Sequence, residues 1–167
     1  LKTLFRTERT VIVGTCSATG FMEMAIRNGV RNKVLAVING AFSERFANIA
    51  AACGREVVKL EVPWGKSVEP DMLRDALKRS EVDAVTMVHS ETSTGVLQDF
   101  EALAKVVHEF KDVMLLVDTV SSLAGAQVEA GIEAPDRAHG EQGEEREPEQ
   151  ERDAVRPGQG RAGWKER

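Results

Sequence analysis

The stretch from Asp83 to Ser122 constrains the fold more than any other part of the chain. It holds an apolar run over 84–88, a polar loop over 89–95, an amphipathic pattern from about 99 to 110, and a second apolar run over 113–117. A strand, helix and strand of this length almost require the two strands to be parallel, with a right-handed crossover between them. The polar residues that follow both strands then lie at one edge of the sheet, where open α/β folds bind ligands.

The residues before this stretch repeat the same alternation. Apolar runs bounded by turn residues predict strands, and apolar positions at helical spacing predict helices between them. The expected strands are 10–14, 33–38, 56–62, 84–88 and 113–117, and the expected helices are 21–27, 42–52, about 70–79 and about 99–110. Such alternation is typical of an α/β fold in which helices cover both faces of a parallel sheet.

The composition changes sharply near residue 130. From there to Arg167 the chain consists mainly of Glu, Arg, Gly, Ala, Pro and Gln, and no Val, Ile, Leu, Met or aromatic residue occurs between Glu133 and Ala154. Such a segment cannot bury enough apolar surface to offset the entropy cost of ordering it. We therefore expect one domain over 1–129 and a disordered, low-complexity tail over 130–167.

Charge and hydropathy limit the possible partners. The net charge of −5 gives no support for nucleic-acid binding. No apolar run approaches the roughly 18 residues of a membrane span, and no signal peptide is visible. Cys16 and Cys53 are too few and too far apart for a disulfide framework or a redox pair. We expect a reduced, cytoplasmic protein without a membrane or nucleic-acid partner, and we identify no metal ligands.

Asp118 is the first candidate functional residue. It directly follows the apolar run MLLV, so its carboxylate lies at the rim of a low-dielectric core, where an unpaired charge is costly. Two interpretations are open at this point. The side chain either caps the next turn or pairs with an arginine, as most such acids do, or it holds a ligand.

The small, hydroxyl-rich run over 15–20 is the second candidate. The start of a helix offers free N–H groups and the positive end of the helix dipole, which together favour a phosphate group. The sequence has neither GxGxxG nor GxxxxGK[ST], so a Rossmann or Walker site is unsupported. A serine or threonine such as Ser17 is also the ordinary N-cap of a helix.

Two motifs together carry a family resemblance. HSETSTGVLQ over 89–98 and LLVDTVSSLAG over 115–125 resemble the class V branch of the fold-type I pyridoxal-phosphate aminotransferases, and within it the alanine–glyoxylate and serine–pyruvate aminotransferases. The similarity runs from about Lys2 to Val128. It implies part of the large domain of a fold-type I transferase, with a parallel-sheet sandwich and pyridoxal 5′-phosphate as cofactor.

The resemblance also implies an activity and partners. In the intact family, an amino group passes from a small amino acid such as alanine or serine to a 2-oxo acid such as glyoxylate or pyruvate. The enzymes are homodimers with the active site between subunits. We expect this activity and this dimer of an intact enzyme of the family.

Seven residues match cofactor-binding positions of the family. They are Ser17, Ala18, Thr19, Phe42, Thr92, Asp118 and Val120. By resemblance, the tripeptide that begins at Ser17 holds the phosphate group, with Ala18 where glycine is frequent. The hydroxyl of Thr92 donates to the phenolic oxygen of the cofactor.

The remaining matched residues surround the cofactor ring. By resemblance, Asp118 pairs with the protonated pyridine nitrogen, Val120 lies against the ring, and Phe42 stacks on it. A carboxylate at the nitrogen keeps it protonated, so the ring can accept electrons. Without the resemblance, Phe42 would be interpreted as an ordinary core residue or a hydrophobic staple.

The Schiff-base lysine of the family is missing. Its expected region is 140–146, where this chain has GEQGEER. Lys165 is the only lysine after Asp118, and it has neither a strand nor a hydroxyl residue beside it. We therefore assign no catalytic residue, and we expect a truncated or frame-shifted product that has kept the cofactor cradle and is inactive alone.

Two other functions are open. In a non-catalytic α/β ligand- or partner-binding module, Ser17–Gly20 would be an ordinary helix cap and Asp118 an ordinary ion-pair partner. A hydrolase would use Cys16 or Ser90 as nucleophile with His89 and Asp118, although the G-x-S-x-G motif is absent.

Overall fold

The computed structural model describes residues 1–126, which belong to one compact unit. The elements are α1 (Lys2–Phe5), α2 (Ala18–Gly29), β1 (Lys33–Ile38), α3 (Ala41–Ala52), β2 (Glu56–Glu61), α4 (Pro70–Lys78), β3 (Ala84–Val88), β4 (Ser90–Glu91), β5 (Val96–Leu97), α5 (Phe100–His108) and β6 (Met114–Asp118). The expected boundary at residue 129, the tail and Lys165 lie outside the described residues.

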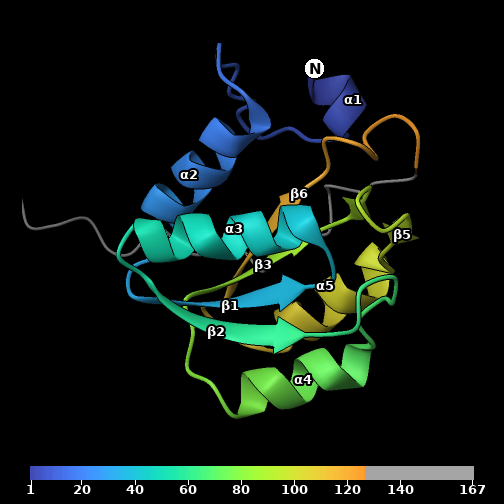
Figure 1. Cartoon of the computed structure of the whole chain (residues 1–167). Helices are drawn as coiled ribbons and strands as arrows, with labels where there is room; N and C mark the ends of the chain where they lie inside the picture. The colour runs from blue at the N-terminus through green and yellow to red at the C-terminus, as the bar shows by residue number, and fades with distance from the viewer. Residues whose placement is uncertain (127–167) are drawn as a thin grey trace, which may run out of the picture. The chain divides into compact units, whose positions relative to one another are not determined.

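Four strands form a parallel sheet in the order β2-β1-β3-β6. The central strands β1 and β3 are buried along almost their whole length, because helices cover both faces of the sheet. In Figure 1, α2 and α3 lie on one face, and α4 and α5 lie on the other. The predicted fold class, a helix-covered parallel α/β sheet, is confirmed.

Alternate residues of β1 enter two separate cores. Leu35 faces the core built with α4 and α5, where Leu73 and Leu103 are fully buried. Val34 faces the core built with α2 and α3, where Ile26 is fully buried. Both layers of helices are therefore held on the sheet by apolar contacts along the same strand.

Local signals account for the helix boundaries. Pro70 occupies the first position of α4, where the missing N–H costs nothing. The side chain of Asp99 caps α5 by accepting a hydrogen bond from the amide of Ala102 at 3.0 Å. Both helices begin within a residue or so of the predicted positions.

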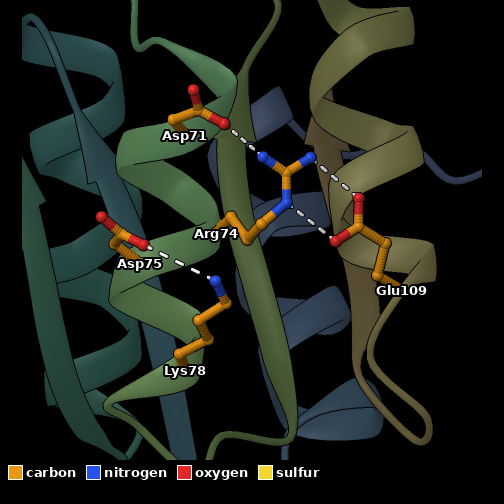
Figure 2. Close-up of polar contacts among 5 residues, drawn as sticks. All are labelled: Asp71, Arg74, Asp75, Lys78 and Glu109. Atoms are coloured by element: carbon orange, nitrogen blue, oxygen red, sulfur yellow. Dashed lines mark hydrogen bonds and ion pairs between the residues drawn. The ribbon is translucent and has the colours of Figure 1, made fainter.

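An ion-pair cluster joins the exposed sides of α4 and α5, as Figure 2 shows. The Nε and Nη2 atoms of Arg74 each lie 2.8 Å from a carboxylate oxygen of Glu109, and Nη1 bonds Asp71. The hydrogen bonds from Arg74 lower the pKa of the Glu109 carboxyl, even though burial opposes this. The planar guanidinium thus bridges two acids, one on α4 and one directly after the end of α5.

The predicted strand over 10–14 is wrong. This run is extended but belongs to neither sheet, and Ile12 and Val13 are 67% and 75% exposed. A strand needs a neighbour to satisfy its backbone N–H and C=O groups, and no strand of residues 1–126 pairs with this run. The parallel sheet therefore has four described strands instead of the expected five.

The predicted polar loop over 89–95 also contains structure that was not expected. β4 and β5 form a short antiparallel hairpin, with Glu91 opposite Val96. Gly95 has a φ of 73°, a left-handed conformation that glycine adopts without strain. The hairpin brings residues 91–94 against the start of α3.

Candidate functional site

A pocket of about 120 Å³ lies at the carboxyl edge of the sheet, where α2 and α3 begin and β3 and β6 end. Residues from all four of these elements or their following turns line it. They are Ala18, Thr19, Met22, Phe42, Arg45, Val88, Ser90, Asp118, Val120 and Ser121. Residues more than 100 positions apart therefore meet in one pocket.

The structure brings together Ala18, Thr19, Phe42, Asp118 and Val120, all of which were matched from the sequence. Two other matched residues do not line the pocket. Ser17 is the exposed N-cap residue of α2, and its hydroxyl makes no capping hydrogen bond. Thr92 is exposed in the turn between β4 and β5.

Asp118 ends β6 beside the last residue of β3, Val88. Its carbonyl oxygen accepts a hydrogen bond from the amide of His89 at 2.9 Å, and its Oδ1 accepts one from the amide of Val120 at 2.8 Å. Within residues 1–126 the carboxylate forms no ion pair and no further hydrogen bond. The side chain does cap the following turn, and Oδ2 is left to act as an acceptor in the pocket.

The start of α2 offers open donors to the same pocket. The amides of Gly20 and Phe21 donate to the carbonyl oxygen of Ser17, at 2.9 and 3.3 Å. The amides of Ala18 and Thr19 lie in the first turn of α2 and have no carbonyl of their own helix to bond. No acidic residue occupies this first turn, so the positive end of a 12-residue helix is uncompensated.

Phe42 and Arg45 form the side of the pocket that α3 contributes. The guanidinium carbon of Arg45 lies 5.1 Å from the centre of the Phe42 ring, within the range of a cation–π contact. Arg45 forms no ion pair within the described part of the chain. Sequence reasoning missed Arg45, although its position one helical turn after Phe42 places both on one face of α3.

Glu91 is the second functional candidate that sequence reasoning missed. Its side chain is fully buried beside the start of α3, where it accepts hydrogen bonds from Phe42, Ser43 and Ser93. Burial alone would raise the pKa of Glu91, but these hydrogen bonds outweigh burial and hold the pKa below its ordinary value. The carboxylate is therefore charged inside the fold.

His89 is a buried residue that directly follows β3. Its Nδ1 is 2.9 Å from the Oγ of Ser122, and its ring packs against Phe100. Burial lowers the pKa of the imidazole. No hydrogen bond within residues 1–126 joins the side chain of His89 to Cys16 or Ser90, so the arrangement that a hydrolase would need is not formed there.

Within residues 1–126, no group of three or more His, Cys, Asp or Glu side chains could hold a metal ion. The same part of the chain has no helix with the length and apolar character needed to cross a membrane.

Comparison with known proteins gives a consistent family match. The family model described as aminotransferase class-V matches residues 6–131. An uncharacterized aminotransferase of Methanocaldococcus jannaschii is 43% identical over 131 residues, which are 77% of this chain and 34% of the relative. The serine–glyoxylate aminotransferase of Methylorubrum extorquens is 35% identical, over 74% of this chain and 32% of the relative.

Solved structures give the same result. The alanine–glyoxylate aminotransferase from Nostoc sp. superposes with a TM-score of 0.73 at 34% identity, over 77% of this chain and 35% of that one. The chain thus spans about a third of the length of the curated relatives it matches.

Proposed function

The chain belongs to the class V aminotransferase family, and on that premise we propose that its pocket is the pyridoxal 5′-phosphate site of an aminotransferase. Members of this family depend on pyridoxal phosphate. One observation carries the proposal for this chain. The open amides of α2 and the free carboxylate oxygen of Asp118 face one pocket, beside the aromatic ring of Phe42.

The donors and acceptors of the pocket suit the two polar ends of the cofactor. A phosphate dianion would bind at the amides of Ala18 and Thr19, where the helix dipole favours negative charge. A protonated ring nitrogen would bind Oδ2 of Asp118 in a charge-assisted hydrogen bond. The flat ring would lie between Phe42 and Val120. When bound, the cofactor would supply the electron sink on which amino-group chemistry depends.

We assign Ser17 and Thr92 to the rim of this site. The hydroxyl of Ser17 makes no capping bond, so it is free to donate to a phosphate oxygen. Thr92 directly follows Glu91, whose hydrogen bonds hold the hairpin against α3. Each hydroxyl would add one hydrogen bond to an oxygen of the cofactor.

For the intact enzyme we propose transfer of an amino group from a small amino acid, such as alanine or serine, to glyoxylate or pyruvate, in a homodimer. The serine–glyoxylate and alanine–glyoxylate aminotransferases among the similar proteins support this substrate class. The region 140–146 offers no lysine, so we expect this chain to bind the cofactor without turning over substrate.

Titration of pyridoxal phosphate into the full chain, followed by cofactor absorbance and tryptophan emission, tests the proposal. Asp118→Asn removes a charged acceptor, so we expect binding to weaken about 10- to 100-fold, the equivalent of the roughly 1.5–3 kcal/mol of a hydrogen bond to a charged group. Asp75→Asn, an exposed change on α4, is the matched control. Equal dissociation constants for both variants would contradict the proposal.

A further inference from the structure

One buried carboxylate connects two of the segments that frame the pocket. The Oε2 atom of Glu91 accepts hydrogen bonds from the amides of Phe42 at 3.1 Å and Ser43 at 2.9 Å, and from the hydroxyl of Ser43 at 3.0 Å. Its Oε1 atom accepts from the hydroxyl of Ser93 at 2.6 Å and the amide of Ser93 at 3.3 Å. Oε1 also accepts a hydrogen bond from the amide of Phe42 at 3.4 Å, so the one carboxylate bonds both the start of α3 and the hairpin turn.

The same turn supplies the remaining partner that the start of α3 needs. The hydroxyl of Ser93 accepts a hydrogen bond from the amide of Ala41 at 2.9 Å. The first three amides of α3 are therefore all bonded by side chains of residues 91 and 93. The start of α3 is closed to an external anion, whereas the start of α2 is open.

Gly40 packs closely against this junction. A Cβ atom at Gly40 would lie 2.4 Å from Cγ of Glu91 and 2.6 Å from Oγ of Ser93. The φ of Gly40 is 175°, which any residue adopts, so the restriction comes from packing and not from backbone strain. A side chain at position 40 would therefore have to displace Glu91 or Ser93.

We propose that Glu91 is a positioning residue, which fixes the ring of Phe42 and the turn that carries Thr92 relative to each other at the mouth of the pocket. The inference rests on the proposed function, because Phe42 and Thr92 are the residues assigned to the face and the phenolic oxygen of the cofactor. Glu91 itself would touch neither the face nor the phenolic oxygen of the cofactor. It acts through the amide of Phe42 and through the backbone that it shares with Thr92.

A double-mutant cycle tests the effect of Glu91 on ligand binding. Glu91→Gln keeps the shape of the side chain but places an amide group among N–H donors. We expect the pyridoxal phosphate dissociation constant of the full chain to rise roughly three- to tenfold, which is the worth of an aromatic stacking contact. In the Phe42→Ala background, Glu91→Gln should raise the dissociation constant less than about twofold, because the ring that Glu91 positions is absent. An equal rise in both backgrounds would overturn the proposal.

Amide hydrogen exchange tests the coupling without any ligand. Glu91→Gln should speed exchange at residues 41–43 and also at 92–95, and leave α4 and α5 unchanged. A residue that is only a helix cap would affect 41–43 alone, so that result overturns the proposal. Leu103→Ala is the control, because it loosens the core on the other face of the sheet. If the wild-type chain binds no pyridoxal phosphate, the proposed function fails, and the exchange result still decides the role of Glu91.

Discussion

At the scale of single residues, the two helices that begin at the pocket differ in how their first amides are satisfied. Glu91 and Ser93 bond the first amides of α3, and the amides of Ala18 and Thr19 in α2 have no such partner. Both helix starts lie at the same edge of the sheet and carry the same positive dipole. An internal anion thus occupies the start of α3, whereas the start of α2 has open amides.

Gly40 gives the most local prediction. Gly40→Ala should lower the free energy of unfolding by about 1–3 kcal/mol, because the new methyl group would overlap Glu91 and Ser93. Gly125→Ala is the control, since its nearest neighbour would be 3.7 Å away and its φ is not in the left-handed region. Urea denaturation of both variants is the measurement, and equal stabilities would show that the junction is looser than described.

The lowered pKa of Glu91 predicts that the free energy of unfolding depends on pH. Its pKa in the folded chain lies below the ordinary value of 4.5, so its contribution to stability is complete above that value and is lost as the pH falls through the lowered folded-state pKa. The difference in unfolding free energy between wild type and Glu91→Gln should be constant from about pH 7 to 5.5 and shrink below about pH 4.5. Denaturant titrations across this range measure it, and a difference that grows on acidification would contradict the assignment.

The sequence predicted the pocket residues that directly follow an element boundary. Asp118 ends a strand, Ala18 and Thr19 precede a helical pattern, and Phe42 follows a turn, so local pattern and family resemblance located them. Glu91 and Arg45 were not found. Glu91 acts on residues 48 and 49 positions away, and no local pattern indicates which distant amides a carboxylate will meet.

At the scale of elements, local signals predicted the helices and the buried strands well. The cap residue Asp99 and the first helical residue Pro70 set the starts of their helices through local interactions alone. The prediction of a strand over 10–14 was wrong because a strand depends on a neighbouring strand, which its own sequence does not specify. The β4–β5 hairpin was missed because each of its strands has only two residues.

The contact between α4 and α5 predicts a salt-dependent stability. Arg74→Lys cannot keep both hydrogen bonds to Glu109, so the melting temperature at low salt should fall, and the fall should shrink at high salt (Figure 2). Lys78→Gln is the control, because its ion pair with Asp75 is longer, at 3.9 Å, and both side chains are 61% exposed. Thermal melts at two ionic strengths compare them, and an equal shift for both variants would contradict the bridging role of Arg74.

At the scale of the whole molecule, the parallel sheet determines where function is possible. Parallel strands bring the ends of β3 and β6 and the starts of α2 and α3 to one edge, and the pocket lies there. The two cores on either face keep these ends in place. The chain matches about a third of its relatives' length. That third contains a pocket with open amide donors at the start of α2 and a carboxylate acceptor at Asp118.

The most direct measurement is the NMR chemical shift of the ring nitrogen of ¹⁵N-labelled pyridoxal phosphate mixed with the full chain, at a pH where this nitrogen is neutral in the free cofactor. If Asp118 holds the ring, the wild-type chain should give the shift of a protonated pyridine nitrogen, and Asp118→Asn should give that of a neutral one. A neutral nitrogen with the wild-type chain, or the same shift with both chains, would contradict the assignment of this pocket.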